Sequence, residues 1–113
     1  MTITNVLTNL HVSDAHAATA WYEQLFGREP DRRPMDGLVE WQLATTGGVQ
    51  VFDDPESTGG TTVVLTVDDM DAHVADLGSR GITLVSDDVP GAKFRVATVD
   101  DPSGNTIVFI QPN

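Results

Sequence analysis

Few side chains in this 113-residue chain are suited to chemistry, and the first to consider are the three histidines, His11, His16 and His73. Imidazole titrates near neutral pH and is a common metal ligand. His11 ends a predicted strand, where it could orient a ligand or could be a half-exposed strand end. His16 and His73 fall in predicted helices and are expected to face solvent. A metal site built from His11 and Glu40 is a further alternative.

The other reactive side chains show no arrangement for covalent catalysis. The chain has no cysteine, which excludes disulfides, thiolate zinc sites and cysteine nucleophiles. The serines, at positions 13, 57, 79, 86 and 103, all fall in predicted caps, turns or loops. The glycine pairs belong to turns and lack the spacing of a phosphate-binding loop. No nucleophile–base pair can therefore be recognised.

Aromatic side chains offer a second kind of candidate, a surface on which a ligand could stack. Trp41 could form a wall against a planar or cationic ligand, or it could pack in the core or in a dimer interface. Phe52 and Phe94 could line a binding cup or pack in the core. Trp21 and Tyr22 follow helical spacing and are expected in the core.

Composition limits the possible partners. The chain has 17 acidic and 6 basic residues, a formal net charge of −11. Nucleic-acid binding requires a basic surface and is excluded, whereas an acidic surface suits solubility and would steer a cationic ligand. No apolar run approaches the roughly 20 residues of a membrane span, and no signal-peptide pattern is recognisable. We expect a soluble, cytoplasmic protein without membrane contact.

The elements that must position these residues repeat along the chain. The segment Leu10–Asp14 (LHVSD) returns as Leu65–Asp69 (LTVDD), 55 positions later. Each copy leads into a helix-like stretch, a glycine and then strand-like runs. This repeat predicts a duplicated β-α-β unit within a single domain, 1–113, with modules at about 1–56 and 57–113.

Hydrophobic periodicity and turn residues predict the elements of both halves. The first half is expected to contain, in order, a strand at 6–12, a helix at 15–26 capped by Ser13 or Asp14 and ended by Gly27, an edge strand within 28–36, and a hairpin of strands 38–44 and 49–52. The second is expected to contain a strand at 61–67, a helix at 70–80 capped by Asp68 or Asp69, and strands at 82–85, 94–99 and 106–110.

Two motifs resemble the vicinal oxygen chelate superfamily. One is the opening Leu-x-Val-Ser-Asp with the helical segment 20–27 (AWYEQLFG), and the other is the closing segment 101–109 (DPSGNTIVF). This superfamily includes glyoxalase I, bleomycin-resistance proteins, fosfomycin-resistance enzymes, methylmalonyl-CoA epimerases and extradiol dioxygenases. The resemblance implies an α+β fold of two βαβββ modules, whose curved mixed sheets form a cup with the helices outside. It also implies a homodimer.

The resemblance further maps the superfamily's metal site. Enzymes of the superfamily usually hold one divalent ion, and its four ligand positions correspond here to Leu7, Gln50, Thr62 and Val108. First-row divalent ions require imidazole or carboxylate donors, which these residues do not supply. We therefore expect neither a metal ion nor another cofactor.

Strand alternation extends these four positions to a predicted ligand-binding surface. Side chains two apart share a side, which adds Asn9 and His11 to Leu7, Phe52 to Gln50, and Val64 to Thr62. Superfamily members with this closing motif often carry an arginine at the position of Arg95, which could instead form a surface salt bridge. The full predicted set is Leu7, Asn9, His11, Trp41, Gln50, Phe52, Thr62, Val64, Phe94, Arg95 and Val108.

These observations lead to three functional hypotheses. The first is a metal-free, dimeric protein of the glyoxalase/bleomycin-resistance type that sequesters a cationic or aromatic small molecule without catalysis. The second is a glyoxalase-like lyase or isomerase, or a dioxygenase, with a displaced metal site. The third is a regulatory or scaffold module whose cup is vestigial.

Overall fold

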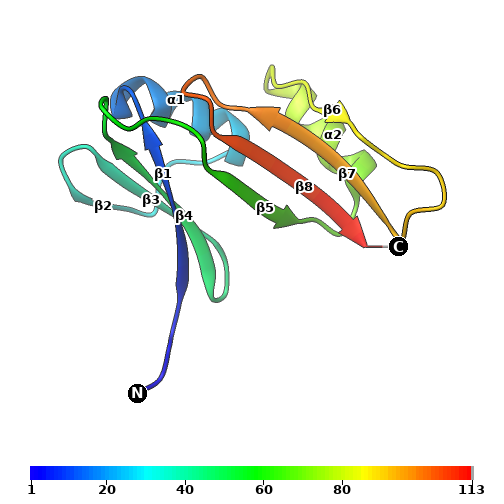
Figure 1. Ribbon diagram of the computed structural model, residues 1–113, viewed down its shortest axis with the longest axis horizontal. Helices are drawn as coiled ribbons and strands as arrows, with labels where there is room; N and C mark the ends of the chain where they lie inside the picture. Colours follow the sequence, from blue (N-terminus) through cyan, green and yellow to red (C-terminus); the bar gives the residue numbers. More distant parts are fainter. Residues whose placement is uncertain (113) are drawn as a thin grey trace.

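The computed structural model describes residues 1–112, and their elements form two modules in the same order, a strand, a helix and three strands (Figure 1). Module one consists of β1 (Val6–Val12), α1 (Ala15–Phe26), β2 (Arg32–Met35), β3 (Leu38–Ala44) and β4 (Gly47–Asp53). Module two consists of β5 (Thr62–Thr66), α2 (Met70–Ser79), β6 (Val85–Ser86), β7 (Phe94–Asp100) and β8 (Thr106–Pro112). The predicted α+β fold with two βαβββ modules is confirmed.

Each module forms its own four-stranded mixed sheet. The strand order is β1-β4-β3-β2 in module one and β5-β8-β7-β6 in module two. The first strand of each module runs parallel to the last, and the other neighbours are antiparallel. β1 and β5 therefore each have one edge with no strand partner in the described chain.

Each helix begins at an aspartate. Asp14 Oδ1 accepts hydrogen bonds from the backbone N–H groups of His16 (3.0 Å) and Ala17 (3.4 Å), and Asp69 Oδ1 accepts one from Ala72 (3.1 Å). These carboxylates satisfy free amides of the first turn and lie at the positive end of the helix. Of the two possible caps in each module, the structure selects the second. Among residues 1–112 no helix is long and apolar enough to span a membrane.

The helices cover one face of each sheet, α1 on β3 and β4 and α2 on β8. In module one the fully buried rings of Tyr22 and Trp41 have centroids 6.0 Å apart, and Phe26 lies 5.4 Å from Trp41. Leu25 is also fully buried in this core. The apolar stripe of α1 thus fixes the helix against the sheet and leaves the opposite face of the sheet open.

Arg80, at the end of α2, contacts the C-terminus of α1. Its Nε donates to the carbonyl oxygen of Gln24 (2.6 Å) and its NH2 group to that of Leu25 (3.2 Å). A cation at this end of a helix satisfies free carbonyls and opposes the negative end of the helix dipole. Gly27 has a positive φ of 72°, and a Cβ there would lie 3.0 Å from the guanidinium carbon of Arg80. The glycine therefore both ends α1 and admits the arginine.

A buried hydrogen-bond network around Asp101 also joins the two modules. Tyr22 Oη donates to Asp101 Oδ2 (2.6 Å), and Asn105 Nδ2 donates to the same oxygen (2.9 Å) and to the backbone oxygen of His11 (2.9 Å). Asn105 Oδ1 accepts from the backbone N–H of Thr61 (3.2 Å). Asn105 is fully buried. The closing motif of module two is thus tied to α1 and β1 of module one.

The second strand predicted for the second half, at 82–85, was wrong in its position. β6 contains only Val85 and Ser86. The N–H of Ile82 bonds to the carbonyl oxygen of Leu77 (3.0 Å) and so completes the end of α2. Ile82 and Leu84 are buried although they lie outside a strand. Their apolar character therefore reflects burial in a loop.

His73 was also predicted incorrectly. Its ring packs on Phe109 with centroids 4.3 Å apart, and its Nε2 is buried without a hydrogen-bond partner in the described structure. Burial lowers the pKa of His73, because the charged form would lose solvation. His16, by contrast, is exposed as expected.

Candidate functional site

Each sheet has one face covered by its helix and one open face. In β1 the buried residues Leu10 and Val12 point to the helix, which places Leu7, Asn9 and His11 on the open face. The same alternation applies to the other strands. It places these predicted site residues on the open faces: Leu7, Asn9, His11, Gln50 and Phe52 in module one, and Thr62, Val64, Phe94 and Val108 in module two.

A line of polar side chains crosses the open face of module one. Asn9, Gln50 and Glu40 are in register across β1, β4 and β3, and Arg32 of β2 pairs with Glu40. Asn9 Nδ2 donates to Gln50 Oε1 (3.1 Å), and Gln50 Nε2 donates to Glu40 Oε1 (3.0 Å). An Arg32 guanidinium nitrogen lies 3.2 Å from Glu40 Oε2. We call these four residues the polar row.

Glu40 is the unusual member of the polar row. The residue is 3% exposed, whereas the side chain of its ion-pair partner Arg32 is 64% exposed. Glu40 Oε2 is within ion-pair distance of Arg32 but accepts no hydrogen bond within the described chain, because the approach lacks hydrogen-bond geometry. Burying a carboxylate costs free energy unless it is both paired and hydrogen-bonded. One oxygen of Glu40 is therefore well satisfied and the other is open to a better donor.

His11 and Phe52 form the next row along the same face. His11 Nδ1 lies 3.0 Å from Asp54 Oδ2, and the His11 ring meets the Phe52 ring edge-on with centroids 5.5 Å apart. His11 thus pairs with Asp54, whereas Glu40 pairs with Gln50 and Arg32. The side chain of His11 remains about one-third exposed, so it can still contact a ligand.

The open face of module two is apolar by comparison. Val64, Val85 and Phe94 are exposed, and Val108 is half-buried beside Val64 in the register. Thr62 is exposed on the edge strand β5. Contiguous exposed apolar groups mark contact surfaces in proteins. The two modules therefore offer different open faces, one polar and one largely aliphatic.

Trp41 lies on the helix side of β3, away from the open face. It is fully buried against Tyr22 and Phe26, and its indole N–H donates to the backbone oxygen of Arg28 (3.1 Å). The sequence left open whether Trp41 stacks on a ligand or packs in the core or a dimer interface, and the structure shows that it packs in the core. Trp41 is therefore not available to stack on a ligand.

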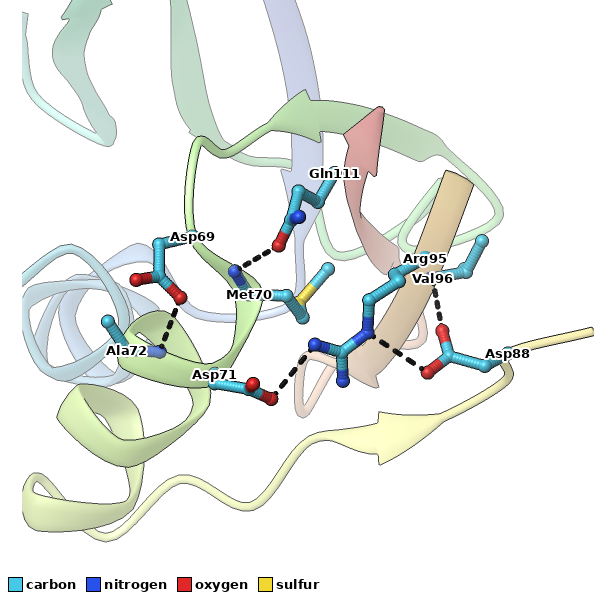
Figure 2. Close-up of polar contacts among 8 residues, drawn as sticks. All are labelled: Asp69, Met70, Asp71, Ala72, Asp88, Arg95, Val96 and Gln111. Atoms are coloured by element: carbon cyan, nitrogen blue, oxygen red, sulfur yellow. Dashed lines mark hydrogen bonds and ion pairs between the residues drawn. The ribbon is translucent and has the colours of Figure 1, made fainter. Parts of the chain in front are cut away.

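Arg95 also lies on the helix side of its sheet, beside the start of α2 (Figure 2). It donates to Asp71 Oδ1 (2.9 Å) and Asp88 Oδ2 (3.2 Å), and Asp88 Oδ1 accepts from the backbone N–H of Val96 (2.8 Å). The Val96 hydrogen bond and Arg95 lower the pKa of Asp88, and the two acids raise the pKa of Arg95. The arginine is thus part of a surface ion-pair network rather than of the open face.

The four positions that correspond to the superfamily's metal site do not fit a divalent ion. Leu7 and Val108 have no donor, Thr62 supplies one hydroxyl, and the amide of Gln50 is bonded to both of its neighbours in the polar row. First-row divalent ions prefer imidazole and carboxylate ligands. Within residues 1–112, no three histidine or acidic side chains are grouped so that they could hold a metal.

Comparison with known proteins identifies the family. The Glyoxalase-like domain family matches residues 6–110, nearly the whole chain. The chain belongs to the glyoxalase-like domain family, within the vicinal oxygen chelate superfamily. No curated protein matches the sequence of this glyoxalase-like domain.

Three solved structures illustrate what this glyoxalase-like domain is similar to. A glyoxalase/bleomycin resistance protein from Catenulispora acidiphila is 30% identical with a TM-score of 0.90, covering 96% of this chain and 98% of that one. TnmS3, an antibiotic binding protein from a Streptomyces species, is 26% identical with a TM-score of 0.78 over 100% and 99%. A bleomycin resistance determinant encoded on transposon Tn5 is 22% identical with a TM-score of 0.79 over 96% and 98%, a likeness of fold alone.

Sequence reasoning considered Glu40 of this glyoxalase-like domain only as a partner of His11, and it did not select Arg32. The signal for Glu40 lies in Val39-Glu40-Trp41, where a carboxylate alternates with two residues that are both buried on the helix side. No comparable signal marks Arg32. Its pairing with Glu40 depends on the register of β2, which shifts between Arg32 and Met35.

Proposed function

We propose that this glyoxalase-like domain binds a small molecule on its open sheet faces and sequesters it without making or breaking bonds. The polar row is the observation that carries the proposal. Two amides, a carboxylate and a guanidinium from four strands are held in line beside the rings of His11 and Phe52. A few fixed polar groups beside apolar surface are typical of small-molecule sites.

The relatives support this choice of function and suggest the kind of ligand. The similar proteins include one described as an antibiotic binding protein and another described as a glyoxalase/bleomycin resistance protein. A formal net charge of −11 attracts cations toward the protein. The ligand we propose is therefore a cationic or aromatic compound of the antibiotic type, and the biological role is resistance by sequestration. The cytoplasmic location expected from the sequence stays a prediction.

A homodimer is part of the same proposal. β1 and β5 each have an edge without a strand partner among residues 1–112, and Val64, Val85 and Phe94 expose apolar surface on the open face of module two. A second copy of the chain would cover this surface and enclose the polar row in a cup. Light scattering should give twice the chain mass of 12.1 kDa, and a monomer at every concentration would remove the dimer from the proposal.

Titration calorimetry against bleomycin and a panel of cationic and aromatic antibiotics tests the proposed function. We expect saturable binding and recovery of an unchanged compound, verified by mass spectrometry. Gln50→Ala should weaken binding by about tenfold, because it removes the hydrogen bond that positions the Glu40 carboxylate, whereas Gln24→Ala on exposed α1 should not. Absence of binding at millimolar concentration would overturn the proposal. Stoichiometric metal together with turnover of a thiohemiacetal would favour the enzyme hypothesis instead.

A further inference from the structure

The charge balance at Glu40 suggests how the site recognises a ligand. This carboxylate is almost fully buried on a face that we propose binds ligands, and its Oε2 accepts no hydrogen bond from the part of the chain that the structure describes. Among residues 1–112 its ion-pair partner is Arg32, whose largely exposed side chain approaches within 3.2 Å. A guanidinium can form two parallel hydrogen bonds with a carboxylate, and this one does not. The buried charge is therefore neutralised by an arginine side chain that can move back into solvent at little cost.

The rest of the polar row holds the carboxylate in place. Gln50 directs its N–H group to Glu40 Oε1 and its carbonyl oxygen to Asn9, so the amide is fixed at both ends. Oε2 is left as a buried acceptor that takes no hydrogen bond from residues 1–112. A preorganised acceptor binds a donor with little ordering cost.

We infer that Glu40 is the cation receptor of this site and that Arg32 is a resident counter-ion, which the ammonium or amidinium group of a ligand displaces. The inference rests on the proposed function and specifies its ligand class. Exchange of one cation for another keeps the buried carboxylate neutralised, so the ligand need not supply the full cost of burying a charge. The hydrophobic body of the ligand then lies along the neighbouring row of His11 and Phe52.

Displacement of Arg32 by the ligand predicts a result that general attraction of a cation to an acidic protein does not predict. Removing Arg32 removes a competitor for Glu40, so Arg32→Gln should tighten the binding of a cation. Arg33 is the matched control, because it is the next residue of the same strand and is also exposed. Arg33→Gln makes the same change in net charge but does not free Glu40.

Three probes of similar shape test the inference: benzamidine, which is cationic, benzamide, which is neutral, and benzoate, which is anionic. Binding is followed by NMR through the side-chain amide signals of Gln50. Wild type should prefer benzamidine to benzamide by about tenfold, the strength of a hydrogen bond between charged groups. Glu40→Gln should abolish that preference. Arg32→Gln should tighten benzamidine binding severalfold, and Arg33→Gln should leave it within about twofold.

The outcomes separate the two proposals. If benzamide and benzamidine bind equally, or if Glu40→Gln keeps the preference while retaining the wild-type unfolding midpoint, the cation receptor is wrong and small-molecule binding stands. If Arg32→Gln and Arg33→Gln change benzamidine binding equally, Arg32 acts only through the net charge of the protein. That result would overturn the proposal that the ligand displaces Arg32. If no probe binds and the antibiotic panel is also silent, both proposals fall.

Discussion

Replacing Asn105 with alanine should destabilise the protein by about 2–4 kcal/mol, because one fully buried amide connects both modules. Its three partners differ in what they lose. The His11 carbonyl keeps the N–H of Gly59 (3.0 Å), and Asp101 Oδ2 keeps the hydroxyl of Tyr22 (2.6 Å). The N–H of Thr61 loses the bond that the amide oxygen accepts. Leaving this part-buried N–H unsatisfied costs about 1–3 kcal/mol, and the small cavity adds about 1 kcal/mol.

The assay is urea unfolding at pH 7, followed by tryptophan fluorescence and by far-ultraviolet circular dichroism. Fluorescence reports on the core of module one through Trp41, so agreement of the two signals shows that the modules unfold together. Asn9→Ala is the control, because Asn9 is exposed and its side chain makes a single hydrogen bond within the described residues. Its stability should change by no more than about 0.5 kcal/mol.

A second variant tests the mechanism. Asn105→Asp keeps the shape but places a second carboxylate where the amide nitrogen lies 2.9 Å from Asp101 Oδ2. Like charges at that distance should destabilise the fold more than alanine does at pH 7, and the loss should shrink as the pH falls and the pair takes up a proton. A loss below about 1 kcal/mol for alanine, or wild-type stability for aspartate at pH 7, would refute the reasoning.

Two further predictions concern pH and the linker. Burial lowers the pKa of His73 below its ordinary value of 6.5, so the unfolded chain takes up the proton first. The contribution of His73 to the free energy of unfolding is complete above about pH 6.5 and is lost as the pH falls toward the lower pKa of the folded state. In urea titrations, His73→Phe should therefore lose less stability than wild type between pH 7 and pH 5. Gly59→Ala should lower the thermal midpoint much more than Gly60→Ala. Both glycines have positive φ, but a Cβ at Gly59 would overlap the backbone oxygen of Ser103, whereas a Cβ at Gly60 meets open space. Equal shifts would contradict the steric explanation.

Much of the fold could be predicted because its signals are local. In each copy of the repeat, a strand leads directly into an aspartate that caps a helix, Asp14 in one and Asp69 in the other. Strand alternation also predicted correctly that Asn9 shares a face with Leu7, and Phe52 with Gln50. The failures lie where a distant contact overrides a local pattern. His73 has the spacing of a helix surface, yet it packs on Phe109 of β8.

The candidate site was predicted only in part, for a related reason. Alternation says which residues of one strand share a side, but it does not say which side faces the helix until the strand is paired with its neighbours. Trp41 and Arg95 were therefore grouped with the open face, and packing against α1 and α2 places them on the other side. For the same reason, the pairing of Glu40 with Arg32 was not predicted from the sequence.

The sequence by itself determined the two modules, the two neighbouring residues from which each helix cap is drawn, and the absence of suitable donors at the four metal positions, because these depend on residue type and on neighbours along the chain. Tertiary structure alone decided which distant groups meet. The register of four strands aligns the polar row, and the docking of the modules brings Asn105 to the carbonyl of His11, 94 positions away. Such contacts follow from the simultaneous packing of both helices and both sheets, which no local pattern encodes.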